Sequence, residues 1–67
     1  MPDESLLTPN DVAEILGVSV GTLAQWRHRG HGPRFYSLTG QAVRYRRSDV
    51  DEWVESRRRE PEGTDDA

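Results

Sequence analysis

The side chains best able to do chemistry in this 67-residue chain are its arginines. All nine basic residues are arginine, and six of them lie between residues 15 and 48, a span without aspartate or glutamate. A guanidinium group binds phosphate oxygens or a guanine edge through two parallel hydrogen bonds. Acids outnumber bases on both sides of this span, so the whole chain has a net charge of −3. The distribution of charge, unlike its sum, therefore indicates a polyanionic partner.

The chain has few residues of the types that catalysis or metal binding needs. The chain has no cysteine, and its two histidines, His28 and His31, have no cysteine or paired carboxylate beside them. We therefore expect no enzyme, no catalytic residue, no metal site and no cofactor, with both histidines at the surface or near phosphate. The apolar runs are too short for a signal peptide or a membrane span, so a cytoplasmic protein without a membrane partner is expected.

Residues 17–30 show the pattern of a helix-turn-helix, which would position several of these arginines. A first helix is predicted over residues 9–16 and a second over residues 20 to about 28, because both segments have capping and stop residues at their ends. The predicted caps are Thr8 and Ser19, and the predicted stops are Gly17 and Gly30.

The second helix is predicted to lie against DNA, because its helical wheel separates an apolar side from a polar, basic one. The side expected to face the core comprises Val20, Leu23 and Ala24, with Trp26 at its edge. The residues predicted to contact DNA are Ser19, Gly21, Thr22, Gln25, Arg27, His28 and Arg29. Thr22 and Gln25 are types that reach base edges, and Gly21 would let the backbone approach phosphate. Arg27 falls toward the apolar side, so it either bends out to phosphate or pairs with an acid of the third helix.

A β-hairpin is predicted from strands at residues 34–38 and 42–47, and it would form a wing beside the second helix. Alternation places Val43 and Tyr45 on one face and two arginines on the other, while the first strand leaves open whether Phe35 or Tyr36 faces inward. An arginine face suits the phosphate backbone and the minor groove, although such residues can also merely solubilise an exposed edge. The predicted wing contacts are Arg34, Thr39, Gly40, Gln41, Arg44, Arg46 and Arg47.

A third helix, capped by Ser48, is expected to complete the fold. Val50, Trp53 and Val54 would close the core with the apolar face of the first helix, and residues 57–59 would end the helix or contact phosphate or a partner. That face of the first helix comprises Val12, Ala13, Ile15 and Leu16. Leu6 and Leu7 would pack as a strand or a staple. The expected organisation is a flexible arm (1–5), a winged helix-turn-helix of three helices and a two-stranded hairpin (6–59), and a disordered acidic tail (60–67).

Several short motifs together resemble those of the excisionase and AlpA-type group of small DNA-binding proteins, whose fold is similar to the MerR-type winged helix-turn-helix. They are Leu7-Thr8-Pro9, Asp11-Val12-Ala13, Gly17-Val18-Ser19, Thr22-Leu23, Trp26, Arg29-Gly30, Pro33 and residues 43–50. The resemblance covers Leu6 to about Arg57. It implies a recognition helix in the major groove and a wing on the adjacent minor groove or backbone. It also implies a bacterial or phage origin and association with the nucleoid.

The chain departs from MerR-type activators, because nothing after Arg59 could supply their dimerisation helix or ligand-sensing region, and no small-molecule ligand is expected. Arg27 also stands where such proteins often have an apolar residue.

The resemblance implies two roles, excision and transcription regulation. Group members bend attachment-site DNA and recruit an integrase that excises a phage or element, or they regulate transcription. One module of this size buries only about 600 to 1,000 Å² on DNA, so several copies side by side would be needed for selectivity, which favours excision. A protein-interaction module that uses Trp26, Trp53 or the tail is the alternative without DNA. It is disfavoured because both tryptophans are expected in the core.

Overall fold

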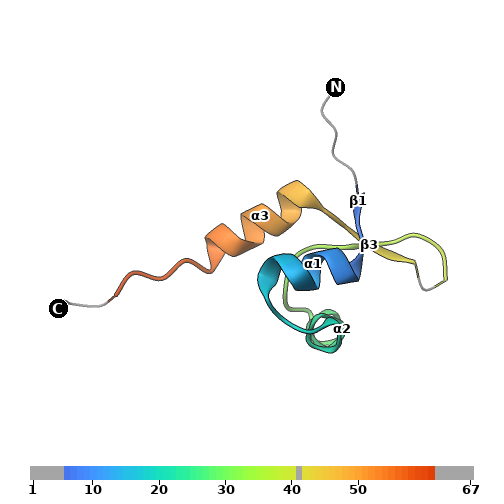
Figure 1. Cartoon of the computed structure of the whole chain (residues 1–67), viewed down its shortest axis with the longest axis horizontal. Coiled ribbons are helices and arrows are strands. Elements are labelled where there is room, and N and C mark those ends of the chain that lie inside the picture. Colours follow the sequence, from blue (N-terminus) through green and yellow to red (C-terminus); the bar gives the residue numbers. More distant parts are fainter. Residues whose placement is uncertain (1–5, 41, 62–67) are drawn as a thin grey trace, which may run out of the picture.

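A computed structural model describes residues 6–40 and 42–61 of the chain (Figure 1). Along the chain these form β1 (Leu6–Leu7), α1 (Pro9–Leu16), α2 (Val20–Arg29), β2 (Tyr36–Ser37), β3 (Val43–Arg46) and α3 (Arg47–Ser56). Three helices and a small antiparallel sheet confirm the predicted fold class. The expected arm, Gln41 and the tail from residue 62 onward lie outside the described residues.

The boundaries of α1 and α2 follow from local capping. Thr8 Oγ1 accepts a hydrogen bond from the Asp11 amide, and the Thr8 amide donates to Asp11 Oδ2, both at 3.1 Å. This reciprocal pair satisfies two amides that a helix start leaves without partners. Gly17 and Gly30 end the two helices in the left-handed conformation, with φ of +71° and +76°. Both predicted stops are therefore confirmed, and α2 continues one residue past its expected end.

The sheet has three strands in the order β1-β3-β2, not the two that were expected. Leu6 pairs with Arg46 and Leu7 with Tyr45, so the two leucines form a strand. On the other side of β3, Tyr36 pairs with Arg44. β3 is therefore the central strand, and β1 supplies hydrogen-bonding partners to the edge that a hairpin alone would leave open.

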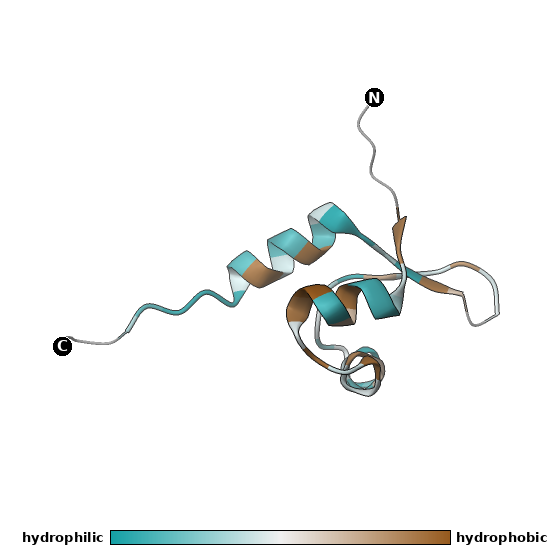
Figure 2. Cartoon of the chain, viewed as in Figure 1, coloured by the Kyte–Doolittle hydropathy of each residue, from teal (hydrophilic) through white to brown (hydrophobic). Residues whose placement is uncertain are grey.

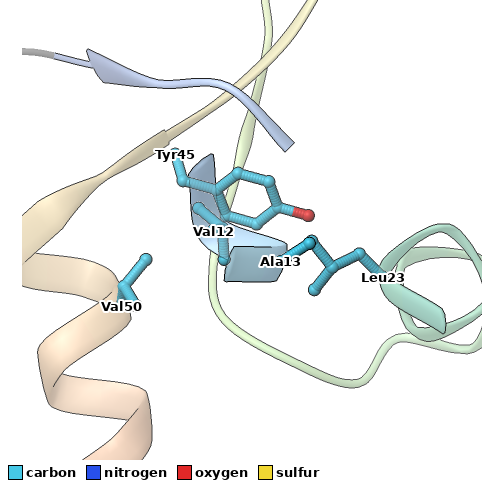
Figure 3. Packing of buried hydrophobic residues seen from close by; sticks show 5 residues of the cluster. All are labelled: Val12, Ala13, Leu23, Tyr45 and Val50. Atoms are coloured by element: carbon cyan, nitrogen blue, oxygen red, sulfur yellow. The ribbon is translucent and has the colours of Figure 1, made fainter. Parts of the chain in front are cut away.

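The core is small and lies between α1, α2, β3 and α3 (Figure 3). Its buried members are Val12, Ala13, Leu23, Tyr45 and Val50. Four residues expected in it are exposed: Ile15, Val20, Ala24 and Val54. Each helix buries only a narrow stripe because so few residues surround the core. Ala24 lies one helical step of about 100° from buried Leu23, which turns it to solvent.

Helix α3 starts one residue before its expected serine cap, because β3 runs into it without a loop. Arg46 occupies the cap position and makes no side-chain capping bond, while Ser48 lies inside the first turn. The helix ends at Ser56, so residues 57–59 follow it instead of completing it. In Figure 1, α3 extends to one side of α1 and the β2–β3 hairpin to the other. Figure 2 shows α3 as largely hydrophilic, with short apolar stretches.

The helices that the structure describes in residues 6–40 and 42–61 are all too short or too polar to cross a lipid bilayer.

Candidate nucleic-acid interface

The solvent face of α2 carries small and polar side chains on successive turns. Gly21, Ala24, Gln25, His28 and Arg29 are all exposed. The two small residues allow a surface to approach the helix closely, and the methyl group of an alanine can contact a thymine methyl. Ala24 was missed in the sequence because its apolar character assigned it to the core. On the helical wheel, Ala24 lies closer in angle to Gly21 and His28 than to Leu23. That angle is the sequence signal that could have identified it as exposed.

The start of α2 is organised by Ser19 and Thr22. Ser19 Oγ accepts the Thr22 amide at 3.0 Å, as expected of a cap, and its hydroxyl donates to Thr22 Oγ1 at the same distance. The cap therefore engages the Ser19 hydroxyl as donor and acceptor. Because Thr22 Oγ1 accepts that bond, its own hydrogen is directed elsewhere, where an oxygen acceptor such as a phosphate or a base carbonyl could receive it. No acid lies in this first turn, which keeps the positive end of the helix dipole free of a carboxylate.

Arg27 points toward the sheet, and the hydrogen bond that it makes there goes to a tyrosine of β3 and not to an acid of α3. Its Nη1 donates to the Tyr45 hydroxyl at 2.8 Å, and its guanidinium lies 5.7 Å from the centre of the Phe35 ring. The side chain is half-buried, whereas Arg29 is exposed. Within α2, the two neighbouring arginines thus serve different surfaces.

The outer face of the sheet carries the wing arginines, as the alternation of β3 predicts. Tyr45 is buried against the core, and the next residue, Arg46, is exposed. The Arg46 guanidinium lies 5.4 Å from the centre of the Tyr36 ring. Phe35 lies on the opposite side, with its ring centre 6.3 Å from that of Tyr45. The question left open by the sequence is therefore settled: Phe35 takes the Tyr45 side and Tyr36 the arginine side.

The hairpin between β2 and β3 narrows to an exposed tip. The Leu38 amide donates to the Ala42 carbonyl at 2.9 Å, and the Ala42 amide donates to the Thr39 carbonyl at 2.8 Å. Thr39 and Gly40 are exposed in this turn. Leu38, which is 51% exposed, adds an apolar side chain to the tip that the sequence did not single out as functional.

An open cleft of about 610 Å³ lies where the α2–β2 loop meets the outer face of the sheet. Arg34 and Arg46 both line it, together with His31 and Tyr36. Asp49, at the start of α3, lines it too. The cleft thus gathers two of the predicted wing arginines beside the rings of Phe35 and Tyr36, with one carboxylate among its lining groups.

Arg44 and Arg47 complete the predicted wing residues. Arg44 is half-buried, and its Nη1 donates to the Val43 carbonyl at 2.8 Å. Arg47 belongs to α3, where its Nε donates to Asp51 Oδ1 at 3.2 Å, with both side chains more than half exposed. The side chain of Arg47 is therefore directed along α3.

Residues 6–58 match the model of a protein family described as a helix-turn-helix domain. The chain belongs to this family. It is accordingly a DNA-binding helix-turn-helix protein. None of the curated proteins compared with the chain matches it significantly.

The fold of this helix-turn-helix protein separates the predicted contact residues into two groups. The exposed face of α2 and the outer face of the wing carry those that a ligand could reach directly, among them Gly21, Gln25, His28, Arg29, Arg34 and Arg46. The others have side-chain hydrogen bonds within the protein that occupy them in part, and these are Ser19, Thr22, Arg27, Arg44 and Arg47. Among the residues described, no cluster of three histidine, aspartate or glutamate side chains could hold a metal ion.

Proposed function

We propose that this protein is an excisionase, a DNA-architectural protein that binds attachment-site DNA in several adjacent copies, bends it, and helps an integrase excise a phage or integrative element. In each copy, α2 would enter the major groove with Gln25 and Thr22 toward the bases. The wing would lie along the adjacent backbone or minor groove through Arg34, Arg44 and Arg46.

The dimensions and charge of the two elements support this placement. A ten-residue helix with side chains is about 10 to 12 Å wide, which suits a major groove about 12 Å wide. The face of α2 that includes Gly21 and Ala24 has little bulk to keep it from the base edges. The arginine face of the wing carries guanidinium groups, which can bind the phosphate oxygens of an adjacent backbone.

The single observation that carries the excisionase proposal is the small number of side chains able to read bases. On α2, the exposed Gln25 can form a bidentate pair with adenine, and the half-buried Thr22 and the exposed Ala24 can add one contact each. One good bidentate contact gives only about 1 to 3 kcal/mol of discrimination. Selectivity would then come from several copies bound side by side, which also bends DNA and builds a platform for an integrase.

The experiment combines footprinting with a recombination assay. Wild-type protein is footprinted on the DNA that flanks its gene, and integrase-mediated excision is measured with and without it. We expect adjacent protected sites that fill cooperatively, together with an increase in excision. Gln25→Ala should reduce both effects, whereas Glu55→Gln, at an exposed position of α3, should leave both unchanged.

Two other results would contradict the proposal. Protection of a single site at a promoter, with no effect on excision, would indicate a small transcription regulator of the AlpA or MerR-like type. No protection at any salt concentration would indicate a protein-interaction module.

A further inference from the structure

Three side chains connect the recognition helix to the wing beneath the proposed DNA surface. Arg27 of α2 donates to the hydroxyl of Tyr45 in β3 at 2.8 Å, and the same guanidinium lies 5.7 Å from the Phe35 ring. Phe35, just before β2, lies in turn 6.3 Å from the Tyr45 ring, centre to centre. The contacts form a closed set of three, with one member from α2 and the others from the two arms of the hairpin.

The arrangement of the backbone makes this set important. The main contacts of α2 are with α1, and β3 also packs against α1. Both elements thus rest on α1, and the side chains that cross between α2 and the wing add a direct link between them. Tyr45 is 1% exposed, and in Figure 3 its hydroxyl is directed toward the side of the core where Leu23 of α2 lies. A buried hydroxyl that holds a charged donor makes a strong, directional link.

We propose that Arg27 is a positioning residue, which holds the recognition helix at a fixed orientation to the wing so that both elements meet one duplex. It acts through Tyr45 and Phe35 and makes no phosphate contact of its own. The role rests on the proposed placement of α2 and the wing on DNA, and it is independent of whether the bound DNA is an attachment site.

The physical reason lies in the linkage of two contact elements. When α2 is docked, the wing binds the same duplex with an effective concentration set by how well its position is fixed. A looser connection lowers that concentration and weakens binding without removing any contact to DNA. A phosphate-binding arginine behaves differently, because its loss also removes a released counterion and lowers the salt dependence of binding.

The test compares Arg27→Met, Tyr45→Phe and the double variant with wild type. The probe is a short fluorescein-labelled duplex selected from a random-sequence pool by the wild-type protein, and affinity is measured by anisotropy between about 50 and 200 mM salt. Each single variant should weaken binding about two- to thirty-fold. The double variant should have the same affinity as the single variant that binds less tightly, because both substitutions break the same link. The slope of log affinity against log salt should stay at the wild-type value in all three.

Arg29→Met is the matched control, since Arg29 is exposed in the same turn of α2. Loss of this side chain should reduce the magnitude of the slope of log affinity against log salt by about 0.9, the value for one phosphate contact on duplex DNA. Thermal melts by circular dichroism confirm that each variant is folded at the temperature of the assay. Phe35→Leu, which removes the ring beside Arg27 from a partly exposed position, gives a second way to loosen the set if Tyr45→Phe fails to fold. It should weaken binding with the same unchanged slope.

Three results would overturn the positioning role while leaving DNA binding intact. They are a fall of about 0.9 in the slope for Arg27→Met, full affinity in a folded Tyr45→Phe or Phe35→Leu variant, and additive losses in the double variant. Failure of the wild-type protein to bind any duplex would instead overturn the proposed function, and the positioning role with it.

Discussion

Replacement of Gly32 by alanine should destabilise the fold strongly, because this glycine lies directly against Trp26 in the loop between α2 and β2. A Cβ atom at residue 32 would lie 2.9 Å from Trp26 Cε3 and 3.2 Å from Trp26 Cβ. Carbon atoms in favourable contact are about 3.5 to 4.0 Å apart, so the tryptophan would have to move. Trp26 also contacts Trp53, with ring centres 5.2 Å apart, so its displacement disturbs the contact between α2 and α3.

The size of the effect has two parts. The backbone φ of Gly32 is +85°, a conformation that costs an L-residue about 1 to 2 kcal/mol. Insertion of a methyl group where there is no space costs about 1 to 3 kcal/mol more. A single core in a chain of this length supplies only about 3 to 5 kcal/mol of stability. We therefore expect Gly32→Ala to lose most of the free energy of unfolding.

The assay is urea unfolding followed by circular dichroism and by tryptophan fluorescence. Gly30→Ala is the matched control, because Gly30 has a similar φ of +76° but nothing within 4 Å of an added Cβ. Gly30→Ala should lose only the free energy of unfolding that a positive φ costs an L-residue. The difference in free energy of unfolding between the two variants therefore measures the contact with Trp26. Equal losses of stability in the two variants would refute the reasoning, since they would mean that Trp26 does not approach Gly32 closely.

The remaining predictions concern base reading, phosphate contact and helix capping. Gln25→Ala should reduce discrimination between the selected duplex and a scrambled one by about 1 to 3 kcal/mol in competition binding, and unchanged discrimination would exclude it as a base contact. Arg46→Ala should weaken binding to both duplexes alike and lower the salt slope by about one; a loss confined to the selected duplex would mean that it reads sequence. Thr8→Ala removes the capping box of α1 and should lower the free energy of unfolding by about 0.5 to 2 kcal/mol, with DNA affinity unchanged where the variant is folded. A smaller affinity at equal folded fraction would contradict a purely structural role for Thr8.

The helices could be predicted closely because local chemistry sets their ends. Thr8 and Ser19 cap α1 and α2 through hydrogen bonds to residues three positions ahead, and Gly17 and Gly30 end them. All of these interactions lie within a few residues along the chain, where sequence patterns carry information. The start of α3 was misplaced for a related reason. Ser48 has the residue type of a cap, but the direct passage from β3 into α3 places the cap position at Arg46.

Contacts between distant segments could not be predicted in this way. The pairing of Leu7 with Tyr45 joins residues far apart in the sequence, and no local pattern specifies it. The partner of Arg27 is likewise a residue eighteen positions away, which the charge pattern could not identify because the acceptor is a neutral hydroxyl. The sequence thus predicted which elements carry the candidate contacts, while the roles of individual side chains depended on tertiary packing.

The central claim is that the exposed face of α2 and the outer face of the wing bind one duplex together. The most direct measurement is a titration of ¹⁵N-labelled protein with the selected duplex, followed by the chemical shifts of the backbone amides. If this claim is right, the largest changes will occur in two segments, Val20–Arg29 and Val43–Arg46, and both will shift in proportion at every step of the titration. Changes concentrated in α3, or changes in only one of the two segments, would contradict it.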